Sequence, residues 1–235
     1  MSSKLRGPIE DRQWPTTLPG RVVKPGPQPR IRGYDLHGDL VEHYGFAEIA
    51  LIALQGNAPE GNAGRLFELA LSLLSACSIA EGPSHGAQLV RRCGARSAAV
   101  LSAGAVGLSE QAQAVVDEHR ELLAWLEAPE DELPAAFRSV DAGQREAVAR
   151  FAARVGELGI DLPILGEQPT FRAALLAALH HCGLRDPERI QAAWILARLP
   201  AVLAEAIEQP AGELRSYPID LPHYEYVPAD DDSTP

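Results

Sequence analysis

Residues 46–59 read FAEIALIALQGNAP and have the period of an amphipathic helix. The apolar side chains recur three and four residues apart and therefore share one face: Phe46, Ile49, Ala50, Ala53 and Leu54. Gly56 and Pro59 then end this helix and begin the next one. No strand pattern of any length follows residue 40. This part of the chain therefore predicts an all-α fold.

The helical period continues almost to the end of the chain. Apolar positions predict further helices at residues 66–77, from residue 84, and at 98–106, 109–127, 142–158, 170–182 and 187–209. Residues 98–106 are small and apolar on every side, which predicts a buried helix. Pro200 is expected to kink the last helix, because proline removes one backbone hydrogen bond.

The two ends of the chain differ from this helical part. Residues 1–30 hold six of the 19 prolines and predict an extended arm with one short strand at 21–24. That arm either packs on a partner subunit or is a disordered tail. Residues 31–228 are expected to form the helical domain, with a reduced small lobe at about 129–185. Residues 229–235 are expected to be a disordered acidic tail.

Composition excludes several classes of protein. Apolar residues make up 46% of the 235 residues and charged residues 23%, as in a globular protein. The chain has no run of about 18 uncharged apolar residues, so we expect no membrane-spanning helix. No apolar segment follows Lys4 and Arg6, so we expect no secretory signal. Three distant cysteines predict neither a disulfide framework nor a metal site and favour the cytoplasm. The net charge of −11 argues against nonspecific nucleic-acid binding.

Several short motifs occur in an order that resembles the citrate synthase superfamily. Near the N-terminal end these motifs are Arg32-Gly33-Tyr34-Asp35, Leu54-Gln55-Gly56-Asn57-Ala58-Pro59 and Gly82-Pro83-Ser84-His85-Gly86. Near the C-terminal end they are Leu196-Ala197-Arg198-Leu199-Pro200-Ala201 and Arg215-Ser216-Tyr217-Pro218. The resemblance covers residues 30–228. The short length is similar to that of citryl-CoA lyases and of the C-terminal module of ATP-citrate lyase.

The resemblance implies a citrate-synthase-like helical fold with a large and a small lobe, and a homodimer. It implies an enzyme that cleaves or forms a carbon–carbon bond between a CoA thioester and a keto acid such as oxaloacetate. The CoA thioester would be a substrate, with no tightly bound cofactor, no metal and no nucleic-acid or membrane partner. The alternative is a noncatalytic homologue that acts as a binding or regulatory subunit. The absence of a glycine-histidine-arginine segment between Ala128 and Val155 supports that alternative.

Two residues are candidates for the chemical step. His85 follows Gly82 and Pro83 at a loop-to-helix junction, where the resemblance implies a hydrogen bond to the developing oxyanion. A capping or core histidine is the alternative. Counted back from Leu179, the resemblance places the carboxylate base at Gln168, which could not accept a proton, or at Glu167 if the loop is shifted by one residue. Glu167 is therefore the candidate base.

Three arginines are candidates for binding substrate carboxylates, because a guanidinium offers two parallel N–H donors. Arg198 lies among Leu196, Leu199 and Val202, and an arginine among apolar residues needs a buried anionic partner. That partner could instead be Glu205 or an acidic helix. Arg215 matches an arginine that the family contributes from the partner subunit, or is a surface residue. Arg32 is either near the site or structural.

Overall fold

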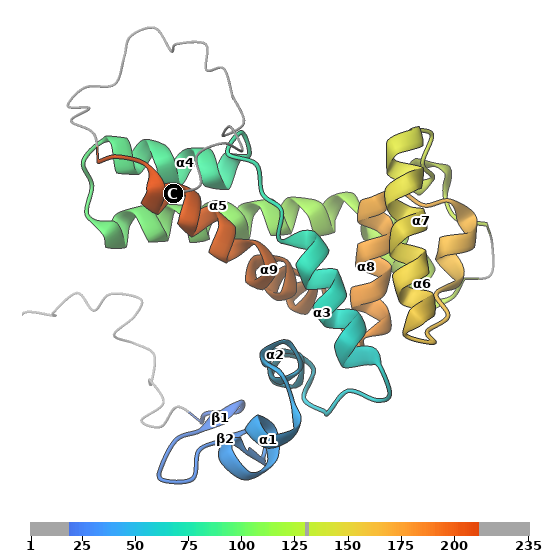
Figure 1. Cartoon of the computed structure of the whole chain (residues 1–235), viewed down its shortest axis with the longest axis horizontal. Helices are drawn as coiled ribbons and strands as arrows, with labels where there is room; N and C mark the ends of the chain where they lie inside the picture. Colours follow the sequence, from blue (N-terminus) through green and yellow to red (C-terminus); the bar gives the residue numbers. More distant parts are fainter. Residues whose placement is uncertain (1–18, 130–131, 212–235) are drawn as a thin grey trace, which may run out of the picture. The chain divides into compact units, whose positions relative to one another are not determined.

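The computed structural model describes residues 19–129 and 132–211, which belong to two compact units that divide between Gly45 and Phe46 (Figure 1). The first unit is a small antiparallel sheet that is followed by a short helical segment. Its elements are β1 (Val23–Lys24), β2 (Arg30–Ile31), β3 (Tyr34–Asp35), the π-helical turn η1 (Leu36–Leu40) and α1 (Val41–His43). The strand predicted at 21–24 is therefore confirmed in part, as Val23–Lys24. Strands β2 and β3 were not predicted, and they lie at the start of the region predicted to be helical.

Local chemistry explains this small sheet. Arg32 and Gly33 have positive φ angles of 54° and 95° and make the turn between β2 and β3. The Asp35 carboxylate then accepts hydrogen bonds from the backbone N–H groups of His37 and Gly38 at 3.0 and 2.8 Å. Asp35 thus caps η1, as aspartate does at helix N-termini. The Arg-Gly-Tyr-Asp motif is a turn followed by a cap.

The second unit is all helical in the described residues. Its elements are α2 (Phe46–Gln55), α3 (Ala63–Leu74), α4 (Gly82–Arg92), α5 (Ser97–Glu118), α6 (Arg120–Glu127), the 3₁₀ turn η2 (Ala135–Phe137), α7 (Ala142–Glu157), the 3₁₀ turn η3 (Pro163–Glu167), α8 (Phe171–His181) and α9 (Pro187–Glu208). The predicted all-α fold is confirmed. Its helix boundaries follow caps visible in the sequence. Thr170 and Asp186 accept backbone hydrogen bonds at the starts of α8 and α9, and Gly183, with φ 88°, follows the end of α8.

Helix α8 is the centre of the core. Every residue from Ala173 to His180 is buried, and α8 packs against α3, α6, α7 and α9. Helix α9 packs with α4 and α5 as well as with α8. It therefore connects the pair α4 and α5 to the helices around α8 (Figure 1). Among the helices of residues 19–129 and 132–211, α9 is the one long and apolar enough to cross a membrane, yet it contacts α3, α4, α5 and α8 as a core helix does. The fold therefore explains its apolar sequence.

The structure corrects two details of the helix prediction. Within residues 98–106 only Val100 and Gly104 are buried, whereas Val106 is 62% exposed. The reason is that α5 presents one face to α4 and α9 and leaves its other face uncovered in the single chain. The helix predicted at 109–127 is divided at His119, which ends α5 and precedes α6.

The predicted lobe boundaries stay a prediction. The described residues 132–141 of the connection are anchored on the core, because Leu133 and Phe137 are buried. Residues 1–18 of the predicted arm, the extended segment at 217–228 and the acidic tail at 229–235 lie outside the described residues.

Candidate functional site

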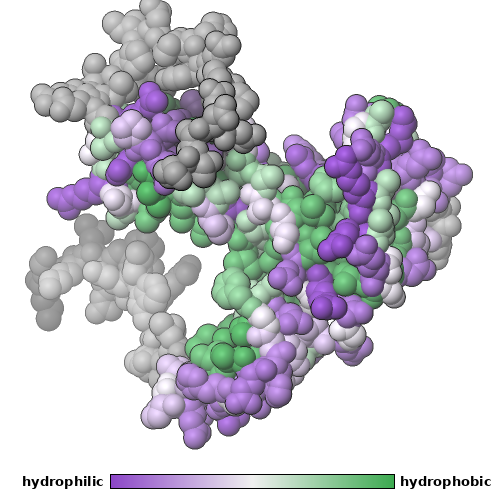
Figure 2. Space-filling model, viewed as in Figure 1, coloured by the Kyte–Doolittle hydropathy of each residue, from purple (hydrophilic) through white to green (hydrophobic). Residues whose placement is uncertain are grey.

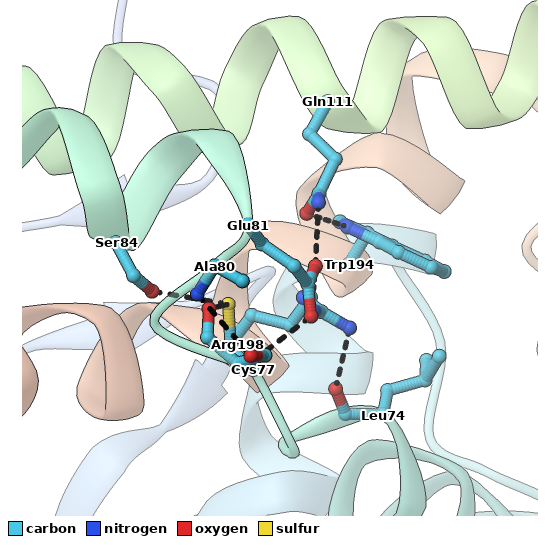
Figure 3. A network of polar contacts seen from close by, with 9 residues as sticks. Leu74, Cys77, Ala80, Glu81, Ser84, Gln111, Trp194 and Arg198 are labelled. Carbon is cyan, nitrogen blue, oxygen red and sulfur yellow. Dashed lines mark hydrogen bonds and ion pairs between the residues drawn. The ribbon is translucent and has the colours of Figure 1, made fainter. Parts of the chain in front are cut away.

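Arg198 has an almost completely buried side chain in the middle of α9. The side chain is 8% exposed, and its guanidinium forms an ion pair with Glu81 (Figure 3). It also donates a hydrogen bond of 3.3 Å to the carbonyl of Leu74. The Nε atom is buried and has no hydrogen-bond partner among the residues that the structure describes. A buried guanidinium with an unsatisfied donor is costly, and such groups mark sites that a ligand can complete.

Glu81 is the anionic partner that the sequence analysis left open, in place of Glu205. It is the N-cap residue of α4, and its carboxylate also accepts hydrogen bonds from the Ser78 backbone N–H at 3.0 Å and from Gln111 at 2.7 Å. Burial alone would raise the pKa of this carboxyl. The bonds from Ser78 and Gln111 and the charge of Arg198 outweigh burial and lower its pKa. Glu81 is therefore ionised at neutral pH and balances the charge of Arg198.

Trp194 extends this polar network toward α8. Its indole N–H donates to the side-chain oxygen of Gln111 at 3.2 Å, so that Gln111 bridges Trp194 and Glu81 (Figure 3). The guanidinium carbon of Arg198 lies 5.1 Å from the centroid of the Trp194 ring, and that of Arg172 lies 5.9 Å from it. Both distances suit cation–π attraction. Two arginines are thus held at one aromatic side chain.

A cavity of about 780 Å³ lies beside this network. It is lined by the C-terminal turn of α3, the junction of α5 and α6, η2, the first residues of α7 and α8, and α9. The side chains that supply its polar chemistry are Arg198, Arg172, Gln144, Thr170, His119, Glu118 and Glu121. Its volume is that of a site for a small molecule. The cavity is open to solvent at one side, where the side chains of Arg172 and Glu118 are 50% and 64% exposed.

The two residues predicted for the chemical step do not line this cavity. His85 is half-buried one turn into α4, and its backbone N–H donates to the carbonyl of Glu81 at 2.9 Å. Glu167 ends η3, and its carboxylate is 3.2 Å from a guanidinium nitrogen of Arg138. Helix α4 packs on α5 and α9, whereas η3 packs on α7 and α8 (Figure 1). The structure therefore does not bring His85 and Glu167 together in the single chain.

Of the three predicted arginines, Arg198 lines the cavity. Arg32 lies in the turn between β2 and β3, in the first unit, and Arg215 lies outside the described residues. The roles given to His85, Glu167, Arg32 and Arg215 stay predictions.

Several residues of the site were not predicted from the sequence, among them Glu81, Gln111, Arg172 and His119. Glu81 carried one signal, since it directly precedes Gly82 and Pro83 at the start of a helix, where an anion is favoured. Gln111 and Arg172 carried none, because each is one polar residue in a helix and its partner is distant in the sequence. His119 carried none either, because the apolar period runs through the helix break at which it lies. Among the described residues, no group of three or more His, Cys, Asp or Glu side chains could hold a metal ion.

The described helices have the fold of citryl-CoA lyases, which confirms the resemblance at the level of fold. The citryl-CoA lyase from Hydrogenobacter thermophilus matches with a TM-score of 0.63 and 20% identity over 95% of this chain and 98% of that chain. The ATP citrate lyase from Methanothrix soehngenii, in complex with citrate and coenzyme A, matches 96% of this chain with a TM-score of 0.55 and 13% identity.

A mutant ATP citrate lyase from Methanosaeta concilii, in complex with (3S)-citryl-CoA, matches 94% of this chain with a TM-score of 0.58 and 14% identity. The match covers 44% of each ATP citrate lyase chain, so this protein corresponds to somewhat less than half of those enzymes. No family model and no curated protein matches the sequence.

Proposed function

We propose that this chain is a citryl-CoA lyase-type enzyme that acts on a CoA thioester of a hydroxy carboxylic acid in the cavity beside Arg198. The observation that carries this proposal is the buried guanidinium of Arg198. It lines a cavity of ligand size, and its Nε has no partner in the described part of the chain. The shared fold supports the reaction class. The products would be acetyl-CoA and oxaloacetate, and the reverse condensation uses the same groups.

The reaction needs three things from the protein. First, the substrate carboxylates must be held. Second, a base must remove the hydroxyl proton as the carbon–carbon bond breaks. Third, the electron pair of that bond forms a thioester enolate, which must be stabilised and then takes up a proton. Arg198 and Arg172 supply positive charge for the first task. His85 and Glu167 are proposed for the other two on the resemblance alone, and their positions imply that a partner chain or a closing movement completes the site.

The direct test is to incubate the purified full chain with (3S)-citryl-CoA and to measure acetyl-CoA and oxaloacetate over time. We expect both products to appear at equal rates that are proportional to the protein concentration. His85→Ala should lower kcat by about 10²–10³, the usual cost of one oxyanion donor. Glu167→Gln should nearly abolish turnover, because an amide cannot accept the proton. A wild-type rate equal to the rate without protein would contradict the proposal.

A second candidate is a binding or regulatory protein with the same fold. Two contacts favour it: the charge of Arg198 is already balanced by Glu81, and Glu167 is paired with Arg138 away from the cavity. A protein of this kind would bind citrate or a CoA thioester without turnover. Calorimetric binding of citryl-CoA together with no release of acetyl-CoA would select this candidate over the enzyme.

We also propose a homodimer. The uncovered face of α5 includes Val106, and Ile207 near the end of α9 is 59% exposed. Figure 2 shows hydrophobic side chains at the surface over the region of α3 and α5. An exposed hydrophobic face on a long helix supports a covering partner, and a second copy would cover it symmetrically.

A further inference from the structure

A basic surface lies at the turn between α4 and α5. Three arginines occur there within six residues, and no Asp or Glu occurs from residue 82 to residue 109, although the whole chain has a net charge of −11. We call these three residues, Arg91, Arg92 and Arg96, the basic turn. It precedes the first residue of α5, a helix of 22 residues, whereas Glu118 at the other end of α5 lines the cavity. The basic turn is therefore separated from the cavity by the length of α5, about 33 Å.

The guanidinium groups of the basic turn have no carboxylate partner in the described part of the chain. Exposed arginines on α7 do have such partners, since Arg150 and Arg154 form ion pairs with glutamates of the same helix. Within residues 19–129 and 132–211 the exposed side chains of Arg92 and Arg96 form neither an ion pair nor a hydrogen bond. A cluster of unpaired cations on an acidic protein attracts an anionic partner.

The last described residues lie beside the basic turn. The Nε atom of Arg91 donates a hydrogen bond of 3.3 Å to the carbonyl of Gln209, directly after α9. Ala211 is the last described residue, and 18 residues lie between it and Asp230. A stretch of this length can span up to roughly 60 Å. Because it starts next to the basic turn, it is long enough to return there.

Residues 230–232 are three consecutive aspartates, and they lie outside the described residues. Their charge complements that of the three arginines, and a guanidinium can bind a carboxylate through two parallel hydrogen bonds. Exposed ion pairs are individually weak. A segment that is tethered to its target has an effective concentration in the millimolar range, so weak pairs are sufficient for it to bind.

Two carboxylates on α9 oppose an acidic ligand at this surface. Helix α9 packs against α4 and α5, and its last turns contain Glu205 and Glu208. Neither forms an ion pair with the basic turn within the described ranges. The arginines outnumber these two carboxylates, so Arg92 and Arg96 stay available to a further anion.

We propose that the acidic segment 230–232 of this chain docks on the basic turn, with its carboxylates on Arg92 and Arg96 and its backbone across Cys93. The inference goes beyond the proposed function, because it concerns a surface at the opposite end of α5 from the cavity. Docking attaches residues 212–229 to the helices at both ends of that stretch. It therefore restrains the segment that contains Arg215, for which the resemblance implies a role in carboxylate binding.

Cys93 can report on this docking, because it is exposed and lies between Arg92 and Arg96 in the sequence. The rate of its alkylation by N-ethylmaleimide, an uncharged reagent, is to be measured on the full chain at neutral pH and low salt. Mass spectrometry of the digested protein distinguishes Cys93 from Cys77, which serves as the internal reference, and from the buried Cys182.

The test compares the wild-type chain with a variant in which the acidic segment is neutral. We expect the combined changes Asp230→Asn, Asp231→Asn and Asp232→Asn to accelerate alkylation of Cys93 roughly threefold, the size of effect that a few exposed ion pairs produce. At about 1 M salt the wild-type and variant rates should be equal, because exposed charges are then screened.

Two further variants identify the cause of any protection. Glu60→Gln, Glu68→Gln and Asp161→Asn together remove three exposed carboxylates on other elements and should leave the rate at Cys93 unchanged. Arg92→Gln with Arg96→Gln removes the docking surface. In that background, neutralising residues 230–232 should no longer change the rate.

Three results would overturn the inference. The first is an equal rate at Cys93 in the wild-type chain and in the variant with a neutral segment at low salt. The second is an equal acceleration by the control variant on other elements, which would show an effect of net charge alone. The third is an acceleration that persists without Arg92 and Arg96. None of these results bears on the cleavage of citryl-CoA, so the proposed function is tested separately.

Discussion

Arg198 and Glu81 show how a single pair can connect fold and function. Their positions are 117 residues apart, and their ion pair joins the middle of α9 to the start of α4. Apolar neighbours in the sequence predict that Arg198 needs a buried anion, but the identity of that anion depends on how the helices pack. For this reason Arg198 could be predicted from the sequence as a site residue, whereas Glu81 could not.

Removal of the Glu81 charge should destabilise the folded chain, because the buried Arg198 would lose its anionic partner. Glu81→Gln keeps the size of the side chain and leaves an uncompensated guanidinium, which should lower the free energy of unfolding by about 2 kcal/mol. This loss of stability is smaller than the loss expected for a fully buried pair, because the Glu81 side chain is one-third exposed. Urea denaturation of the single variants and of Glu81→Gln with Arg198→Met measures the coupling. Additive effects would contradict an energetically important pair.

His119 should make stability depend on pH. Because burial lowers its pKa below 6.5, the unfolded chain binds the proton first as the pH falls. The free energy of unfolding should therefore decrease as the pH drops below about 6.5. His119→Phe removes this contribution and should give a shallower decrease in urea denaturation between pH 7 and pH 5. The exposed His181→Phe variant should keep the wild-type slope, and an unchanged slope in His119→Phe would contradict the assignment of a neutral ring.

At the scale of the helices, the sequence predicted what local chemistry controls. Thr170, Asp186 and Gly183 set helix ends through bonds to their own neighbours, so the bounds of α8 and α9 were predictable to within a residue or two. The burial of α5 depends on which face α4 and α9 cover, and no local pattern contains that information. The break at His119 was hidden for the same reason, since the apolar period runs through it.

The contact between α4, α5 and α9 gives a prediction on glycine. A Cβ atom added at Gly104 would lie 3.0 Å from Cγ1 of Val202 on α9, whereas one added at Gly86 meets nothing within 4 Å. Gly86→Ala should therefore stabilise the chain by up to about 1 kcal/mol through helix propensity. Gly104→Ala should instead destabilise it by roughly 1–2 kcal/mol, because overpacking exceeds the same gain. Thermal denaturation compares the two, and stabilisation by both would show that this contact is loose.

At the scale of the whole molecule, the proposed homodimer accounts for apolar surface that one chain leaves uncovered. An obligate interface of this kind should bury roughly 2,000 Å² or more in total. Light scattering at micromolar concentration should return about twice the chain mass of 25.2 kDa. Val106→Glu places a charge on the uncovered face of α5 and should shift the mass toward one chain, while Glu157→Gln on α7 should not. A wild-type mass of one chain would contradict the homodimer.

The central claim is that the cavity beside Arg198 is where the ligand binds. The fold and the helix-end motifs were predictable, but the site was only partly so, because its residues come from helices that meet only after folding. The measurement that tests the claim is a crystal structure of the full chain soaked with citrate and coenzyme A. We predict density for citrate between Arg172, Trp194 and His119. Citrate bound instead beside His85 or beside Glu167, with the cavity empty, would contradict the account.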